Sequence, residues 1–226
     1  MQIFCDFDGT ISIGDVTDIM LNRFADTHWL TIEDEWKAGK IGSAECMQRQ
    51  IPLIGASKAE LDEALDSIEI DAGFVSFVRL CQTQNIPLTI ISDGVDYFIA
   101  RILARHHLPV LPILANHLEI AQNADGATTY KLSSPFSAGD CTAGVCKCRA
   151  VGGSFGKRVF VGDGQSDFCV SNKPELVFAK GKLATFCDEQ GIDYTAYTTF
   201  FDVAANLESE LLPLRKRAGN AQFAIA

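Results

Sequence analysis

The chain has 226 residues, of which 47% are hydrophobic and 21% are charged, and its net charge is −10. This length and composition suit a globular protein with one domain that carries a large insertion, or with two small domains. Nucleic acids and anionic membrane surfaces are bound by clustered Lys and Arg, so the acidic balance argues against both as partners. A small phosphorylated substrate stays possible, because it needs only one or two local cations.

The N-terminal stretch MQIFCDFDGT lacks the basic segment of a secretory leader. The longest apolar runs, such as residues 109–115, are far shorter than the ~20 residues of a membrane span. The eight cysteines are scattered along the chain, and without a leader they are interpreted as reduced, mostly buried thiols. These features predict a cytoplasmic protein with no membrane association.

Short apolar runs that end in Asp, Asn, Gly or Lys predict buried strands. They lie at residues 2–8, 85–94, 109–116, 158–164 and 174–180. Between them, residues 71–84 and 96–107 repeat apolar positions at intervals of three and four, which is typical of helices. The alternation predicts an α/β fold with a doubly wound parallel sheet, whose functional site lies at the carboxyl ends of the strands.

Residues 14–70 show no strand pattern and predict four helical segments, with Ser43 and Ser57 as N-caps and a capping box from Ser57 to Glu60. We therefore expect a small helical cap domain (14–70) inserted into a core domain formed by 1–13 and 71–226. Residues 116–132 predict a β-hairpin with an Asp-Gly turn, and the weakly patterned tail at 215–226 is expected to fray.

Four acidic or basic motifs follow the predicted strands: DFDGT (6–10), SDG (92–94), Lys147 within CTAGVCKCRA, and GDGQSD (162–167). Their order and residue types resemble the haloacid dehalogenase superfamily of aspartate-nucleophile phosphatases. The helical insert directly after the first motif is similar to that of the branch containing phosphoserine phosphatase. Residues 86–103 (IPLTIISDGVDYFIARIL) and 144–151 (GVCKCRAV) resemble a sister group that includes methionine-salvage phosphatases.

This resemblance implies an Mg²⁺-dependent hydrolase of a small phosphorylated metabolite that works through an aspartyl-phosphate. It implies that Asp6 is the nucleophile and Asp8 the general acid and base. The metal would be bound by the carboxylates of Asp6 and Asp163 and the backbone carbonyl of Asp8, with Asp167 steadying a bound water. The phosphate would contact the Ser92 hydroxyl, the backbone at Gly94 and the Lys147 ammonium.

Elementary chemistry is consistent with these roles. Phosphoryl transfer needs an in-line nucleophile, cations around the phosphate oxygens and an acid for the departing alkoxide. Asp6 and Asp8 are two positions apart, so their side chains share one side of an extended chain, and the turn at Gly9 can direct Asp8 towards the leaving oxygen. An acid at position 8 favours phosphate esters over the dehalogenase or phosphonate-hydrolase alternatives.

Taken singly, each motif also has an ordinary structural explanation. GDGQSD can be an acidic turn, SDG a strand-ending turn, and Lys147 a solvated loop residue. The spacing of Cys141, Cys146 and Cys148 lacks the paired CxxC pattern of structural zinc, so small thiols that shape a tight loop are the favoured interpretation. The combination of motifs in one chain supports the hydrolase.

Substrate specificity is expected in the cap, with Asp15, Arg49 and Trp29 as candidates. Phosphoserine-specific relatives carry a Glu nine residues after the nucleophile, where this chain has Asp15, and a cap Arg, where the alignment gives Gln50 with Arg49 beside it. Phosphoserine phosphatase proper is therefore an alternative, as is a metabolite-binding regulator with the same fold. The chain is expected to be a monomer or a homodimer.

Overall fold

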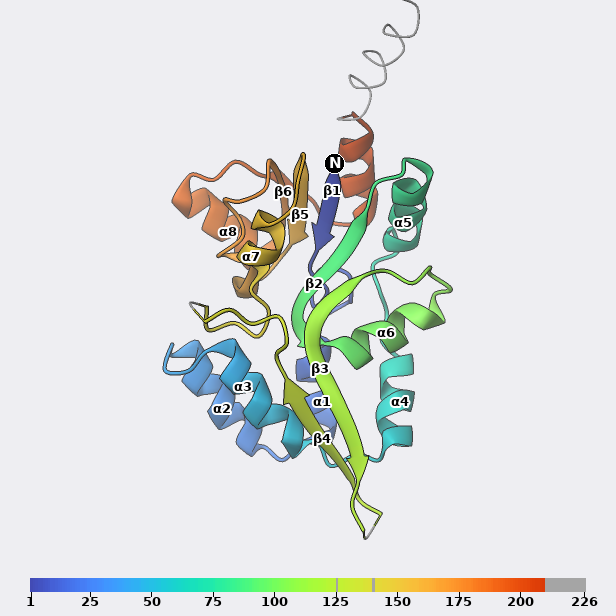
Figure 1. Cartoon of the computed structure of the whole chain (residues 1–226), viewed down its shortest axis with the longest axis vertical. Helices are drawn as coiled ribbons and strands as arrows, with labels where there is room; N and C mark the ends of the chain where they lie inside the picture. The colour runs from blue at the N-terminus through green and yellow to red at the C-terminus, as the bar shows by residue number, and fades with distance from the viewer. Residues whose placement is uncertain (125, 140, 210–226) are drawn as a thin grey trace, which may run out of the picture.

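The computed structural model of the chain describes residues 1–209 apart from residues 125 and 140. Its centre is a seven-stranded sheet in the order β4-β3-β2-β1-β5-β6-β7 (Figure 1). All neighbouring pairs are parallel except β3 and β4, which are antiparallel. The strands are β1 (Gln2–Cys5), β2 (Leu88–Val95), β3 (Ile113–Gln122), β4 (Thr128–Ser133), β5 (Arg158–Gly162), β6 (Leu176–Ala179) and β7 (Thr195–Ala196).

Helices cover both faces of this sheet, which confirms the doubly wound α/β fold. The helices α5 (Phe74–Thr83) and α6 (Asp96–Arg105) lie on one side, and α7 (Lys147–Gly152) and α8 (Gly181–Gln190) on the other (Figure 1). Adjacent strand residues point to opposite faces. In β1, Ile3 and Cys5 are therefore buried in one apolar cluster and Phe4 in the other. Both faces are covered by apolar side chains, as in parallel sheets generally.

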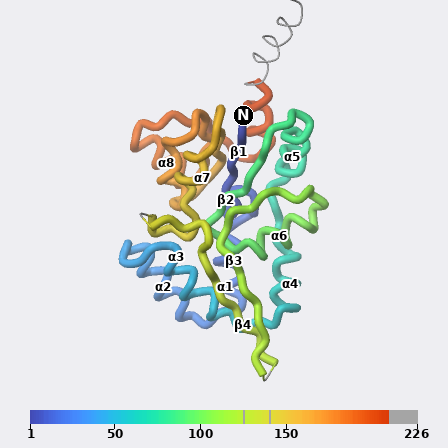
Figure 2. Tube along the Cα trace, viewed as in Figure 1, coloured from blue at the N-terminus to red at the C-terminus, as the bar shows by residue number. Residues whose placement is uncertain are grey.

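The segment between β1 and β2 is helical, as the sequence predicts. It contains α1 (Val16–Phe24), α2 (His28–Lys37), α3 (Ser43–Gln50), the 3₁₀ turn η1 (Ile51–Leu53) and α4 (Lys58–Asp66). We call α1 to α4 the cap helices. They lie beyond the carboxyl ends of β1 and β2, beside the β3–β4 hairpin. Figure 2 shows that this hairpin extends away from the other strands of the sheet. The Tyr130 hydroxyl of the hairpin donates a 2.9 Å hydrogen bond to the carbonyl of Ala56.

The chain enters and leaves the cap helices through two segments that lie side by side and form an isolated bridge. Ser12 and Ile70 form an isolated antiparallel bridge. The amide of Ile13 donates to the carbonyl of Glu69 at 2.9 Å, and the amide of Asp71 donates to the carbonyl of Ile11 at 2.8 Å. The crossing lies next to the boundaries 13/14 and 70/71. The division into a core domain (1–13 and 71–226) and a cap domain (14–70) stays a prediction, because apolar side chains of both regions share one cluster.

Two local expectations need correction. The strand expected at 109–116 and the first strand of the hairpin are one element, because β3 pairs in parallel with β2 at Ile113 and continues into antiparallel pairing with β4 at His117. The N-cap of α3 is Gly42 rather than Ser43, whose hydroxyl is used elsewhere. The capping box of Ser57 and Glu60 is confirmed.

Residue 125 of the expected Asp-Gly turn and the tail at 215–226 lie outside the described residues. Within the described part of the chain, no helix is long and apolar enough to cross a membrane.

Candidate active site

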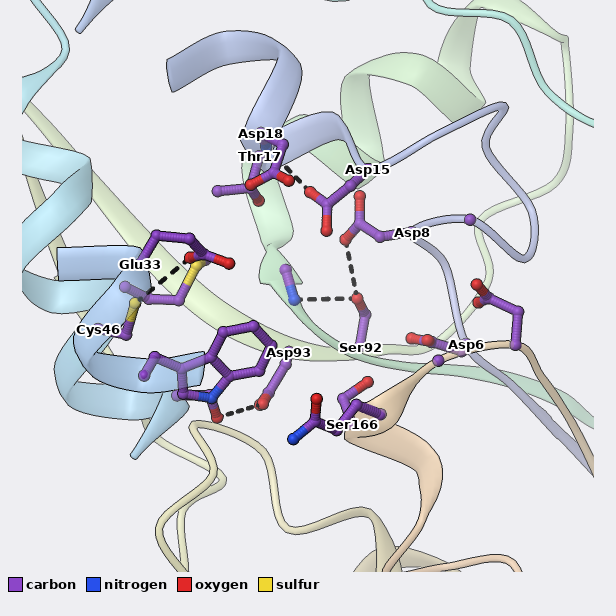
Figure 3. Close-up of a pocket in the computed structure, with 18 of the residues that line it drawn as sticks. Asp6, Asp8, Asp15, Thr17, Asp18, Glu33, Cys46, Ser92, Asp93 and Ser166 are labelled. Atoms are coloured by element: carbon purple, nitrogen blue, oxygen red, sulfur yellow. Dashed lines mark hydrogen bonds between the residues drawn. The ribbon is translucent and has the colours of Figure 1, made fainter. Parts of the chain in front are cut away.

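A pocket of about 550 Å³ opens between the carboxyl ends of the central strands and the cap helices (Figure 3). Parallel strands end at the same edge of a sheet, which brings residues that are distant in sequence together here. Five of the residues expected from the motifs line the pocket: Asp6, Asp8, Ser92, Gly94 and Asp163. The chain therefore gathers its acidic motifs around one cavity.

Lys147 lies at the base of this site and is only 1% exposed. Its Nζ is 2.8 Å from Oδ1 of Asp6, 2.6 Å from Oδ1 of Asp167 and 3.0 Å from Oγ of Ser166. Lys147 is the first residue of α7 rather than a loop residue as expected. Despite its burial, the negative charges of Asp167, Asp6 and Asp93 raise its pKa. A buried ammonium therefore holds one oxygen of the expected nucleophile.

The carboxylates of Asp6, Asp163 and Asp167 could hold a metal ion, because one oxygen from each lies within 4.8 Å of the others. Burial is the first cause that raises the pKa of both Asp6 and Asp163, and the charge of Asp167 raises both further. A divalent cation would offset this repulsion, and carboxylate oxygens are the ligands that Mg²⁺ prefers. The donor set therefore fits the expected cation.

The three carboxylates are not equivalent. Oδ1 of Asp167 contacts Lys147, and its Oδ2 accepts hydrogen bonds from the amides of Asp163 (3.0 Å) and Gly164 (3.2 Å). From the described residues, Asp163 accepts one side-chain hydrogen bond, from the hydroxyl of Thr10 at 2.7 Å. Asp163 therefore has more free oxygen lone pairs for a metal than Asp167 has.

Asp8 lies beside the second motif. One of its oxygens accepts the amide of Val16 at 2.8 Å, and the other accepts the hydroxyl of Ser92 at 3.3 Å. Burial, and then the charge of Asp15, raises the pKa of Asp8 to about 8. A Cβ at Gly94 would overlap the Asp8 carboxylate, so this close approach requires glycine. Asp8 is thus set up to carry a proton at neutral pH.

The cap contributes only one of its three expected residues to the pocket. Asp15, the N-cap of α1, lines the pocket. Trp29 is buried in the apolar core, with 5% of its surface exposed, and does not line the pocket. Arg49 points to solvent, where it pairs with Glu35 at 2.6 Å and with Glu45 at 3.4 Å. The structure therefore brings one of the three cap candidates to the pocket.

Residues other than the three cap candidates complete this wall. Trp36 and Gln50 line the pocket, and the Gln50 amide donates to Glu33 at 3.1 Å. Asp93, the middle residue of the SDG motif, also faces the cavity (Figure 3). Thr10 and Asp93 lie inside recognised motifs, which is a signal that could have found them. Glu33 carries no such signal.

Comparison with known proteins shows the family of this chain. The model of the haloacid dehalogenase-like hydrolase family matches residues 3–171. A 2-hydroxy-3-keto-5-methylthiopentenyl-1-phosphate phosphatase of Geobacillus kaustophilus is 30% identical over 92% of this chain and 96% of its own. A protein of the same name from an Exiguobacterium species is 28% identical over 92% and 97%.

Solved structures share the fold. A phospho-aspartyl intermediate analogue of phosphoserine phosphatase superposes with a TM-score of 0.66 at 18% identity, over 91% of this chain and 97% of that one. A cytosolic 5'-nucleotidase IIIB bound to cytidine gives a TM-score of 0.63 at 15% identity, over 96% and 87%. The chain belongs to the haloacid dehalogenase-like hydrolase family. Its relatives support the assignment of this chain as a phosphoric monoester hydrolase.

Proposed function

We propose that this enzyme is an Mg²⁺-dependent phosphatase that hydrolyses a small phosphorylated metabolite through an aspartyl-phosphate on Asp6. The observation that carries the proposal is the contact of 2.8 Å between Asp6 and the buried Lys147, at the floor of a pocket that also holds Asp8. Lys147 fixes one oxygen of Asp6, so the other can attack phosphorus in line. The same ammonium compensates the charge of the phosphate.

Asp8 acts at the leaving oxygen. With its pKa raised to about 8, it donates a proton to the departing alkoxide and then accepts one from the water that cleaves the aspartyl-phosphate. The hydroxyl of Ser92 and the amide of Gly94 lie beside it and bind phosphate oxygens. Mg²⁺, bound by Asp6, Asp163 and the backbone carbonyl of Asp8 and steadied by Asp167 through a water, would neutralise phosphate charge.

For the substrate, we propose a small phosphate ester other than phosphoserine. The relatives named as methylthiopentenyl-phosphate phosphatases support a small metabolite. On the cap side of the pocket the carboxylates of Asp15, Asp18 and Glu33 face the cavity, whereas the expected guanidinium of Arg49 lies outside it. A substrate carboxylate would therefore find no guanidinium there. The cap-side cation that does line the pocket, Lys37, is paired with Glu33 at 3.4 Å. A monomer or homodimer in the cytoplasm is part of the same proposal.

The test is phosphate release from a panel of phosphorylated metabolites, with an aryl phosphate included, in the presence and absence of Mg²⁺. Wild type is compared with Asp6→Asn, which keeps the size of the side chain and removes the nucleophile. Release that needs Mg²⁺ and disappears in Asp6→Asn is the expected result. No release from any ester by folded protein would favour the metabolite-binding regulator, and full activity in Asp6→Asn would exclude the aspartyl-phosphate.

A further inference from the structure

Two thiols flank the buried lysine of the active site. Cys146 is the N-cap of α7, Lys147 its first residue and Cys148 its second. The sulfur atoms of Cys146 and Cys148 are 3.4 Å apart, and both thiols are free. Cys146 is buried, whereas Cys148 is partly exposed, so a small reagent can reach the pair from the Cys148 side. The mechanism uses neither thiol.

Two more cysteines belong to this neighbourhood. Cys141 interacts with Cys146, and Cys169, which is exposed, interacts with Cys148. A soft metal could use such a cluster, but metal binding needs several ligand atoms within a few ångströms of one another. Among the described residues, the only group that meets this condition is formed by Asp6, Asp163 and Asp167. The observed arrangement therefore favours bond formation within the close pair over metal binding by all four thiols.

We propose that Cys146 and Cys148 are a site of reversible oxidation by peroxide, and that the disulfide they form displaces Lys147 and stops hydrolysis. One thiol loses its proton, the thiolate attacks a peroxide oxygen, and the O–O bond breaks to give a sulfenic acid and hydroxide, which takes up that proton as water. The second thiol then loses its proton, its sulfur attacks the sulfenic sulfur, and the S–O bond breaks to release hydroxide, which the second proton converts to water. Two electrons pass from the thiols to the peroxide, and a dithiol restores the reduced pair.

The consequence for Lys147 follows from geometry. A disulfide has an S–S length of about 2.05 Å, so the two sulfurs must approach by about 1.4 Å from their present 3.4 Å separation. Lys147 lies inside the small ring that closes, and its backbone must move with the ring. Its Nζ now contacts Asp6, Asp167 and Ser166 at 2.6 to 3.0 Å. A misplacement of about 1 Å can lower a rate about a hundredfold, so we expect at least a tenfold loss.

Oxidation is expected to be slow at neutral pH. Burial, followed by the hydrogen bond between Cys148 and Cys146, raises the pKa of Cys148 to about 11. Only a small fraction of the thiol is then ionised, and the thiolate is the reacting form. We therefore expect the disulfide to form during sustained exposure to peroxide and not during brief exposure.

Trypsin provides a direct measurement, because it cleaves after Lys147, between the two cysteines. In the full-length enzyme treated with hydrogen peroxide and then with an alkylating agent, a Cys146–Cys148 bond keeps the dipeptide Cys148–Arg149 attached to the peptide 132–147. We expect this linked species in mass spectra, at least tenfold slower phosphate release, and recovery of both after dithiothreitol. Cys148→Ser should keep its activity under peroxide.

Two further variants separate the alternatives. A Cys141–Cys148 bond would give the same linked species, because Cys141 lies in the same peptide as Cys146. Cys141→Ser should therefore still form the linked species if the bond is between Cys146 and Cys148. Cys187→Ser, which removes a buried thiol of α8, should behave as wild type. Inactivation without the linked species, a linked species without loss of activity, a link to the peptide that contains Cys169, or inactivation of Cys148→Ser would each overturn the proposal.

The loss of activity rests on the proposed function, whereas the bond does not. If no ester is hydrolysed before oxidation, the proposed function fails, and the linked peptide still supports or overturns the disulfide.

Discussion

The hydroxyl of Ser43 lies 2.5 Å from Oδ2 of Asp93, which joins the first residue of α3 to β2. The other carboxylate oxygen, Oδ1, accepts the amide of Val145 at 2.7 Å, two residues before Lys147. The amide of Ala44 also donates to the carbonyl of Thr142 at 3.2 Å. One carboxylate thus holds both a cap helix and the segment that leads to the active-site lysine.

This double contact predicts that Ser43→Ala impairs catalysis although Ser43, which lines the pocket, has no role in the proposed reaction. A hydrogen bond to a charged group contributes about 1.5–3 kcal/mol, so kcat/KM should fall roughly tenfold. Asp93→Ala removes both contacts and should cost more. Steady-state kinetics of the best ester, with kcat and KM separated, measure the effect.

The matched control is Ser57→Ala, which breaks the capping box of α4 away from the pocket. It should lower the free energy of unfolding by about 1 kcal/mol and leave KM unchanged. If Ser43→Ala changes only stability, as Ser57→Ala is expected to do, Asp93 does not couple the cap to the lysine.

The acidic cluster predicts that Mg²⁺ stabilises the fold through Asp163. A ligand that binds only the native state adds about 2.7 kcal/mol when its concentration is a hundred times Kd. Saturating Mg²⁺ should therefore raise the melting temperature of wild type and have little effect on Asp163→Asn, as thermal denaturation can show. Asp188→Asn, a change at an exposed carboxylate of α8, is the control. An equal rise in wild type and Asp163→Asn would place the metal elsewhere.

The centre of the site could be predicted from sequence because its residues follow strands. Asp6, Ser92 and Asp163 each end or follow an apolar run, and parallel strands bring such ends to one edge. Lys147 could be chosen by its position between motifs. The partner of Ser43 could not be predicted, because it lies 50 residues away and depends on how α3 docks.

The cap residues show the limit of sequence patterns. Arg49 and Gln50 are neighbours in α3, yet successive residues point about 100° apart around a helix, so one faces solvent and the other the pocket. Trp29 and Trp36 share a face of α2 but lie about 10 Å apart along its axis. Trp29 is in the core and Trp36 at the pocket. Which face and which end meets the cavity is set by tertiary packing.

The raised pKa of Asp8 predicts the direction of the pH dependence. Because burial and Asp15 raise this pKa from its ordinary value of 3.8 to about 8, the proton needed by the alkoxide is present below that pH. It is lost as the pH rises through the pKa. For an alkyl phosphate, kcat/KM should therefore fall on the alkaline side, while an aryl phosphate, whose leaving group needs little protonation, should respond less.

Asp15→Asn provides the matched test of this pH dependence. Asn also serves as an N-cap, so α1 is retained while the charge that raises the Asp8 pKa is removed. The fall of kcat/KM on the alkaline side of the pH profile should move to lower pH. If it stays at the same pH, or is equally steep for the aryl phosphate, a group other than Asp8 causes it.

The pocket wall predicts that Trp36→Ala raises KM and that Arg49→Ala does not. Burial of a large apolar side chain against a ligand contributes about 1.5–3 kcal/mol, so loss of the Trp36 ring should raise KM roughly tenfold or more. Arg49 is bound to Glu35 and Glu45 at the surface, and its removal should leave KM unchanged. Saturation kinetics with the best ester decide between them. If KM rises in Arg49→Ala and stays unchanged in Trp36→Ala, then α3 presents Arg49 to the substrate.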